Sequence, residues 1–374
     1  MSGVREARPG ELRAAVRDFL AGQLAAGGYR PRCDSWLSGF SPEFSRALAA
    51  RGWVAMTWPR ECGGHERSEL ERFTVNEELL AAGAPVAAHW FGDRQVGPGL
   101  LKYGTQGQRS RFLPAIARGE CYFSIGMSEP DAGSDLASVR TRAAKADGGW
   151  RVDGTKVWTS HAHRSHYMLT LVRTSPAAGS DRHTGLSQLI IDLRAPGVQV
   201  NPIPFLDGEQ HFNEVVLDNV LVPEDALLGQ EGAGWAQATS ELAHERSGPE
   251  RFLSTFPLLA ELVRRYGHRG NAELGVLLAE LATLRRLSYG VAQELQAGAA
   301  PAVQAALVKD LGTRFENRVI DVARRIADVE PDPDSGDPLT RLLAEAVLHA
   351  PAFTLRGGTS EILRGVVARA VVPK

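Results

Sequence analysis

Apolar residues recur every three or four positions in the first third of the chain, which is the spacing of one face of an α-helix. The stretch GELRAAVRDFLAGQLA at positions 10–25 has this spacing, and it recurs at 41–52, 68–83 and 106–120. Glycine lies at several of the ends, where helices commonly stop. The pattern therefore predicts a helical region over residues 1–119.

From Cys121 to Leu228 the hydrophobic period changes to two, which is the period of β-strands. Glycine-containing segments separate the apolar runs and predict turns, for example at Asp147–Gly149 and Asp153–Thr155. Short strands at this regular spacing favour a small antiparallel barrel or sandwich. The expected strands are 121–129, 139–146, 150–154, 156–160, 166–174, 186–193, 198–203 and 212–220.

The helical spacing returns after the tetrapeptide GAGW at 232–235 and continues to the end, interrupted by a proline-rich loop at 330–338. A chain of 374 residues is too long for one simple core. We expect an α+β fold of three domains: an all-α domain at 1–119, a β-domain at 120–228 and a helical bundle at 229–374.

Charge and composition exclude several kinds of partner. The 42 basic and 44 acidic residues give a net charge of −2, which offers no general attraction to nucleic acid or to an anionic membrane. No stretch reaches the ~18 to 20 uncharged apolar residues of a membrane span. Cys33, Cys62 and Cys121 lack the spacing of a zinc site or a disulfide scaffold, which is typical of a reducing cytoplasm. The first twenty residues have the mixed charges of a surface helix, not of a targeting peptide.

Two polar stretches of the strand region contain residue types that suit a ligand site. In IGMSEPDAGSDLASVRT, at 125–141, turn-forming residues at the end of a strand bring backbone and hydroxyl groups together. In GTKVWTSHAH, at 154–163, two hydroxyl side chains follow a tryptophan, which suits a planar polar ring. Each stretch also has a plainer explanation, an exposed surface loop for the first and a core tryptophan for the second.

A pair of glycines precedes a predicted helix in TLRGGTSEILRG, at 354–365. We predict Gly358 as the N-cap of this helix, with Glu361 at position N3, where a carboxylate suits the helix dipole. Backbone N–H groups at such a helix start are available to an electron-rich group. Because Gly357 and Gly358 carry no side chain, an acid or base for chemistry here must come from another part of the chain.

Taken in their order, these stretches resemble the acyl-CoA dehydrogenase family. The likeness is strongest at SEPDAGSD (128–135), KVWTS (156–160) and GGTSEILR (357–364), and it extends over nearly the whole chain. The resemblance implies an enzyme with FAD that desaturates an acyl-CoA thioester between Cα and Cβ. It also implies an electron-transferring flavoprotein or similar acceptor, and an oligomer that is either a homotetramer or a hetero-oligomer with a second family member.

By the family's pattern, residues of the β-domain form the flavin site. Met127 and Ser128 are expected to bind the flavin ring, and Trp158 and Ser160 are expected to flank it. Ser134 is expected near the flavin pyrophosphate or the CoA arm, where it contacts cofactor and substrate.

The resemblance also implies where the catalytic base lies. Many members carry a glutamate at the position of Gly357, but a group similar to isovaleryl-CoA dehydrogenase takes it from a C-terminal helix, directly before an arginine, as in Glu245–Arg246 here. The base is therefore expected at Glu245, and the Gly357 N–H is expected at the thioester carbonyl. Arg246 and Gly358 are expected to contact the substrate, and Thr359 the cofactor. Without the resemblance, Glu245 fits an ion-paired residue on a polar helix face.

The sequence departs from the family pattern at several positions. Asp131 replaces a usual glycine and adds a negative charge to the flavin loop, and Arg356 replaces a position that is often aromatic. The C-terminal region also lacks the two motifs by which relatives reach the adenine end of FAD in a neighbouring subunit. The corresponding segments are 261–278 and 323–338. We therefore favour a hetero-oligomer in which a second family member supplies these contacts.

Three other functions remain open for this fold. Relatives include flavin-dependent oxygenases and dehydrogenases that act on acyl groups bound to a carrier protein. The absence of a side chain at Gly357 is also compatible with a non-catalytic partner subunit.

Overall fold

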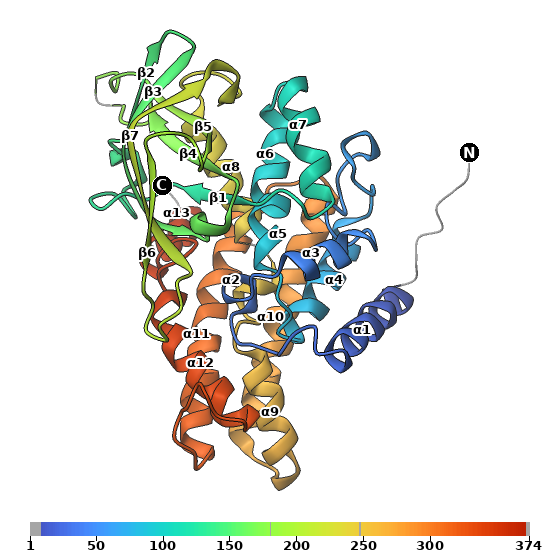
Figure 1. The fold of residues 1–374 in the computed structure, drawn as a ribbon. Coiled ribbons are helices and arrows are strands. Elements are labelled where there is room, and N and C mark those ends of the chain that lie inside the picture. Colours follow the sequence, from blue (N-terminus) through green and yellow to red (C-terminus); the bar gives the residue numbers. More distant parts are fainter. Residues whose placement is uncertain (1–8, 180, 247, 372–374) are drawn as a thin grey trace. The chain divides into compact units, whose positions relative to one another are not determined.

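The computed structural model describes residues 9–179, 181–246 and 248–371 (Figure 1). The chain forms two compact units, which we call the helical unit and the sheet unit. The helical unit comprises Met1–Phe44, Glu66–Ala87 and Arg246–Lys374, and the sheet unit comprises Ser45–His65 and Ala88–Glu245. The N-terminal and C-terminal segments thus belong to one unit, although the whole sheet lies between them in the sequence. The domain boundaries expected near residues 119 and 228 stay a prediction.

Long helices packed along one another form the helical unit. Its two longest described helices, α10 (Ala272–Gln296) and α11 (Ala302–Ile326), contact each other (Figure 1). α11 also contacts α13 (Ser360–Val371), and α10 contacts α4 (Glu69–Ala81). Further helices are α1 (Pro9–Ala25), α2 (Ser35–Ser38), α9 (Phe256–Tyr266) and α12 (Pro338–Phe353). Among the described residues, no helix has the length and apolar character needed to cross a membrane.

Polar side chains determine where these helices begin. Ser68 Oγ accepts a hydrogen bond from the Glu71 amide and the Glu71 carboxylate accepts one from the Ser68 amide, which is a capping box at the start of α4. Asp337 accepts from the Thr340 amide (3.0 Å) at the start of α12. Because α11 ends at Ile326, the interruption predicted at 330–338 lies between α11 and α12.

The described part of the sheet unit contains one eight-stranded sheet with the order β6-β7-β3-β2-β4-β5-β8, in which β1 pairs with β4. Its strands are β1 (Phe123–Gly126), β2 (Arg142–Ala146), β3 (Gly149–Ser160), β4 (Tyr167–Arg173), β5 (Leu186–Asp192), β6 (Val198–Ile203), β7 (Phe212–Pro223) and β8 (Leu227–Leu228). Most neighbours are antiparallel, but β1 and β2 pair with β4 in parallel. The sheet is therefore mixed, with the antiparallel character that the alternating sequence predicts.

The central strands β4 and β5 are buried on both faces. Met168 belongs to a cluster with Ile191 and Val215, whereas the next residue, Leu169, belongs to a second cluster with Phe112 of α7 (Gln106–Ala117). Successive side chains of a strand point to opposite faces, so alternate residues enter different cores. This explains why apolar residues occur at successive positions of these strands, as in Met168–Leu169 and Leu189–Ile191.

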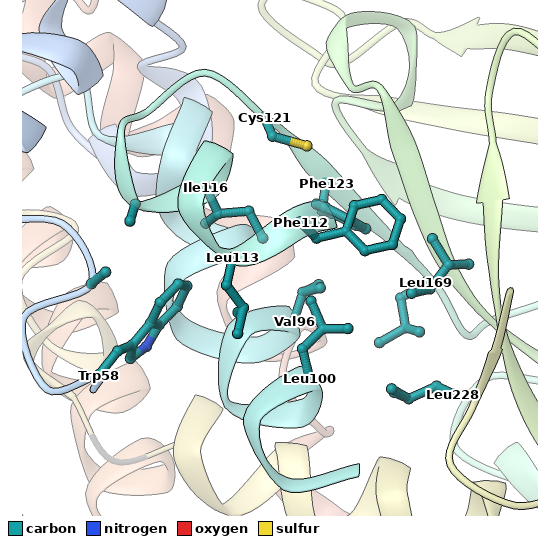
Figure 2. Packing of buried hydrophobic residues seen from close by; sticks show 13 residues of the cluster. Trp58, Val96, Leu100, Phe112, Leu113, Ile116, Cys121, Phe123, Leu169 and Leu228 are labelled. Atoms are coloured by element: carbon teal, nitrogen blue, oxygen red, sulfur yellow. The ribbon is translucent and has the colours of Figure 1, made fainter. Parts of the chain in front are cut away.

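The second cluster joins helices of the sheet unit to the sheet (Figure 2). Figure 2 shows Leu100 of α6 (Gly97–Tyr103) and Phe112 directed toward Leu169 of β4. The rings of Phe112 and Phe123 meet edge to face, with centroids 5.6 Å apart. This packing fixes the start of β1, and β1 leads into the polar loop at 127–135.

The turn predicted at Asp153–Thr155 is wrong, because β3 runs through these residues as one strand. Gly154 has φ of 151°, and the register with β7 shifts between Val152 and Gly154, which marks a β-bulge. A Cβ on Gly154 would lie 2.7 Å from Thr141 Cα. The glycine therefore permits close approach of two strands instead of reversing the chain.

The helical stretch at 87–103 lies within the region predicted to be helical, although no individual helix is expected there. Glycine and proline make it a weak helix by composition, yet packing requires one of these glycines. A Cβ on Gly97 would lie 1.8 Å from Trp58 Cζ2, so only glycine fits against this buried ring. The elements are α5 (Ala87–Phe91), the π-helical turn Gly92–Val96 and α6, while α3 (Pro42–Ala49) and α8 (Gly234–Glu245) also contribute to the sheet unit.

We expect Gly97→Ala to destabilise the protein by about 1 to 3 kcal/mol, because the new methyl group displaces the Trp58 ring. Gly107→Ala is the control, since its Cβ has only Thr105 Oγ1 within 4 Å, at 3.9 Å. We expect this control to be neutral or to stabilise by up to about 1 kcal/mol, because alanine restricts the unfolded chain. Urea unfolding measures both values, and equal stability of the two variants would contradict the packing argument.

Candidate active site

A buried ion pair holds the polar loop that follows β1. Lys156 Nζ donates to Glu129 Oε1 at 2.8 Å, and the two side chains are 0% and 7% exposed. The Glu129 carboxylate also accepts hydrogen bonds from the amides of Arg140 (2.6 Å) and Thr141 (2.9 Å). Burial by itself raises the pKa of Glu129, but the charge of Lys156 and these hydrogen bonds hold this pKa below its usual value. Burial lowers the pKa of Lys156 to about 8, against the opposing effect of Glu129.

The same lysine joins the two polar stretches that the sequence singles out. Lys156 Nζ donates to the Met127 carbonyl at 3.2 Å, and the Val157 amide donates to the Ser128 carbonyl at 3.0 Å. Met127 and Ser128 are half-buried. Residues 127–128 are therefore brought beside β3, next to the position of Trp158.

Trp158 has an unusual conformation for a large side chain in a strand. Its φ is 59°, in the left-handed region, and its side chain is 56% exposed. The register between β3 and β7 shifts between Lys156 and Thr159, so Trp158 lies in a β-bulge. Its ring meets Phe212 edge to face, with centroids 5.9 Å apart. Strain at a bulky residue is characteristic of functional sites, and the exposure excludes a core tryptophan.

The other predicted residues of the sheet unit lie at its surface or at the end of β3. Ser160 is half-buried and pairs with Phe212 of β7, and Ser134 is exposed in the polar loop. Asp131 forms an ion pair with Arg140 at 3.4 Å, in which both side chains are more than three-quarters exposed. Such exposed pairs are worth little, but Arg140 offsets the extra negative charge of Asp131.

In the helical unit, several contacts fix the C-terminal loop at 354–359. At its beginning, buried Lys309 donates from Nζ to the Phe353 carbonyl at 2.6 Å. In its middle, Arg356 Nη1 donates to Asp34 Oδ2 at 2.5 Å and Nη2 donates to Ser254 Oγ at 3.0 Å. The aromatic residue usual at position 356 is thus replaced by an arginine that binds other parts of the same unit.

The glycine pair of this loop is in contact with Arg246. Arg246 Nε donates to the Gly357 carbonyl at 2.9 Å. Gly357 and Gly358 have φ of 67° and 95°, and a Cβ on Gly358 would lie 3.1 Å from Arg246 Nη2. Within the described part of the chain, the Gly357 N–H makes no hydrogen bond. Arg246 and the glycine pair are therefore brought together, while their role in a substrate site stays a prediction.

The predicted N-cap of the last helix is displaced by one residue. α13 begins at Ser360, so the N-cap is Thr359 and not Gly358. Thr359 Oγ1 accepts a hydrogen bond from the Ile362 amide at 3.4 Å, as a threonine N-cap does at position N3. Glu361 then lies at N2, still in the first turn, where its charge suits the helix dipole.

Glu245 is the last residue of α8. Its backbone belongs to the sheet unit, and Arg246 begins the following segment of the helical unit. The side chain of Glu245 lies outside the described residues, so its role stays a prediction.

Sequence reasoning overlooks three buried charged residues that support these loops. Glu129 and Lys156 lie inside the motifs SEPDAGSD and KVWTS, and a lysine among apolar strand positions is the signal that reveals a buried partner. Asp34 has no comparable signal, because its partner Arg356 lies 322 positions away.

Three family descriptions match the chain. They are the acyl-CoA dehydrogenase N-terminal domain at residues 9–120, the middle domain at 124–220 and the C-terminal domain at 269–372. The acyl-CoA dehydrogenase IpdE1 of Mycobacterium tuberculosis is 35% identical over 386 residues, which cover 97% of each protein. FadE34 of the same organism, also an acyl-CoA dehydrogenase, is 33% identical over 95% of this chain, and the match spans only 50% of FadE34.

Two solved structures have the same fold. The Tcur3481-Tcur3483 steroid ACAD has a TM-score of 0.85 and 28% identity, and the ChsE4-ChsE5 complex from Mycobacterium tuberculosis has a TM-score of 0.81 and 27% identity; each match covers 100% of both chains. The architecture is that of an acyl-CoA dehydrogenase, with N-terminal helices, a middle sheet and C-terminal helices. This chain belongs to the acyl-CoA dehydrogenase family. The predicted family, fold class and enzyme class are confirmed, and the chain is a flavoprotein oxidoreductase of lipid metabolism.

The buried ion pair generates a prediction about stability. We expect Lys156→Met to destabilise the protein by about 3 to 5 kcal/mol, because it leaves the Glu129 carboxylate buried without its counter-charge. Lys145→Met is the matched control, since Lys145 is 72% exposed in its pair with Glu231, and we expect a loss below about 1 kcal/mol. Urea unfolding measures both, and adding Glu129→Gln to Lys156→Met should recover part of the loss. Similar losses for the two lysine variants would contradict this reasoning.

Proposed function

We propose that this chain catalyses the FAD-dependent α,β-desaturation of an acyl-CoA thioester, with Glu245 as the base that removes the α-proton. The observation that carries this proposal is the loop at 354–359. Its Gly357 carbonyl is held by Arg246, while its Gly357 N–H has no partner among the described residues. The loop thus offers a fixed donor for a thioester oxygen but no side chain that can act as a base.

The residues of the sheet unit fit a flavin ring. Trp158 is exposed in spite of its size, and the segment at 127–128 is fastened beside its strand. This arrangement supports Met127, Ser128, Trp158 and Ser160 as the residues that would hold the ring of FAD. When bound, FAD would accept the hydride that leaves Cβ of the substrate. We retain Ser134 and Thr359 as further proposed contacts of the cofactor.

Two features of the sequence and structure support Glu245 as the base. Gly357 cannot supply a carboxylate, and Glu245 directly precedes the arginine that holds the Gly357 carbonyl. A carboxylate positioned at the substrate Cα accepts the proton in the transition state and so accelerates the reaction. This acceleration depends on the position of the carboxylate. In this proposal Arg246 has two tasks, because it contacts the CoA substrate and also fixes the loop.

The Gly357 N–H would act on the thioester oxygen of the substrate, while Glu245 acts on the neighbouring Cα. As the α-proton leaves, the thioester oxygen gains negative charge, and a preorganised N–H that points at this oxygen lowers the energy of the transition state. Removal of one such donor typically costs about 3 kcal/mol. A side chain at position 358 would approach Arg246. Glycine at this position would therefore leave the space beside Arg246 open to the thioester.

We further propose that the chain assembles with a different family member and passes electrons to an electron-transferring flavoprotein or a similar acceptor. The segments 261–278 and 323–338, where relatives have motifs for the adenine end of FAD, lack these motifs here. The first contains the end of α9 and the start of α10, and the second contains the loop between α11 and α12. Two similar proteins of known structure are named as pairs, Tcur3481-Tcur3483 and ChsE4-ChsE5. Both names support a hetero-oligomer, and the word steroid in the first supports a bulky, ring-bearing acyl group.

We expect Glu245→Gln to retain bound FAD but to lower kcat by about 10²- to 10⁴-fold, because the amide cannot accept the α-proton. Glu241→Gln, one helical turn earlier on α8, is the control and should keep wild-type turnover. Anaerobic bleaching of the flavin by a panel of CoA thioesters measures the rates. Near-normal turnover by Glu245→Gln would move the base to another residue, and rapid oxygen consumption by the wild type would favour an oxygenase.

The assembly is tested by native mass spectrometry. We expect the chain expressed alone to bind less than one FAD per chain, because the contacts to the adenine end are missing, and to bind it fully when co-expressed with its partner. A stable homotetramer with one FAD per chain would contradict the hetero-oligomer.

A further inference from the structure

Arg356, the residue directly before Gly357, is held by hydrogen bonds and by contacts with two aromatic rings. Its two terminal nitrogens donate to Asp34 Oδ2 and Ser254 Oγ. Its guanidinium carbon lies 4.6 Å from the ring centre of Trp36 and 4.8 Å from that of Phe353. The side chain is 12% exposed. A planar guanidinium that contacts two aromatic rings and binds two fixed acceptors has little freedom to move.

Asp34, the acceptor, is itself fixed in place. Its side chain is 1% exposed, and its Oδ2 also lies 3.3 Å from His349 Nδ1. The Asp34 amide donates to the Ser254 carbonyl at 2.7 Å, and the Asp34 carbonyl accepts from the amides of Leu37 and Ser38. Burial by itself would raise the pKa of Asp34, but Arg356 and His349 hold this pKa well below its usual range. The carboxylate is therefore a charged anchor in the interior of the helical unit.

The peptide bond between Arg356 and Gly357 lies between two anchored points. On one side is the Arg356 side chain, and on the other is the Gly357 carbonyl, which accepts from Arg246 at 2.9 Å. The ends of the loop are also fixed, through Lys309 at the Phe353 carbonyl and through the Ser360 amide, which donates to the Thr354 carbonyl at 3.3 Å. The direction of the Gly357 N–H follows from these contacts, because that N–H belongs to the anchored peptide.

We propose that Asp34 is a positioning residue of the active site, which acts through Arg356 to aim the Gly357 N–H at the thioester oxygen. This inference rests on the proposed function of Gly357. Asp34 itself touches neither substrate nor cofactor in this role. It maintains the geometry of a donor that is useful only in the transition state, so its loss should affect kcat more than substrate binding.

The test compares Asp34→Asn with Glu345→Gln in the oligomer as purified. The control is matched, because Glu345 is also a buried carboxylate, paired with Arg341 at 2.7 Å, and it accepts from the amide of Cys33, the neighbour of Asp34. Both changes replace a carboxylate by its amide. We expect Asp34→Asn to lower kcat by about 10- to 100-fold with KM changed less than about threefold. We expect Glu345→Gln to retain kcat.

A spectroscopic readout separates positioning from general loss of structure. The probe is the member of the CoA thioester panel that the wild type oxidises fastest, labelled with ¹³C at its carbonyl. Infrared difference spectra should show a low-frequency shift of this carbonyl in the wild type and in Glu345→Gln, because a hydrogen bond weakens the C=O bond. In Asp34→Asn the shift should be reduced. An unchanged shift and unchanged kcat in Asp34→Asn would overturn the inference and leave the proposed function intact.

Two further outcomes are decisive. If Asp34→Asn does not fold, the double variant Asp34→Asn/Arg356→Gln removes both charges, which a buried site tolerates better than removal of one. It should then fold with the same reduced kcat and reduced carbonyl shift, and wild-type values in this variant would refute the positioning role. If the wild-type protein neither binds nor oxidises any thioester of the panel, the proposed function and this inference both fail.

Discussion

The structure of the sheet unit depends on the buried pair of Lys156 and Glu129. Transfer of two charges from water to the interior is unfavourable, and their attraction offsets this only when further hydrogen bonds satisfy the remaining polar atoms. Here those bonds come from the Met127 carbonyl and from the amides of Arg140 and Thr141. The pair therefore contributes less to stability than to geometry. It attaches an irregular loop to a strand that contains a strained tryptophan.

Buried charged groups also fix a loop in the helical unit, the loop at 354–359. Lys309, Asp34 and Arg356 are buried or nearly buried, and each binds a backbone or side-chain atom that fixes the chain at 353–357. Apolar packing alone fixes a loop poorly, since a glycine-rich segment has few side chains to bury. Charged hydrogen bonds to the Phe353 and Gly357 carbonyls, and from the Arg356 side chain to Asp34, restrain the loop in defined directions. The exposed pair of Asp131 and Arg140, in contrast, has no such rigidity.

The sequence predicts features that arise from neighbouring residues better than features that arise from contacts between residues far apart in the chain. Period-two alternation locates β1 to β7, because burial on a sheet face is recorded locally in each strand. It fails at Gly154, where close contact with Thr141 determines which residue fits. In the predicted helical region, the requirement for glycine at position 97 likewise arises only from its contact with Trp58. The site motifs are found because their residues are contiguous. Asp34 is missed because its acceptor role arises only when folding brings it to Arg356, 322 positions away.

The backbone conformation of Gly357 restricts which residues this position can accept. Its φ of 67° is left-handed, and a side chain in this region costs about 1 to 2 kcal/mol. A glutamate at 357 would therefore strain a loop that Asp34, Arg246 and Lys309 already hold. This conformation therefore disfavours a carboxylate base on the loop itself, in line with the proposal that Glu245 supplies it. In the proposed site the loop would then act through its backbone alone, and the direction of the Gly357 N–H would depend on Asp34 and Arg356, which do not themselves contact the substrate.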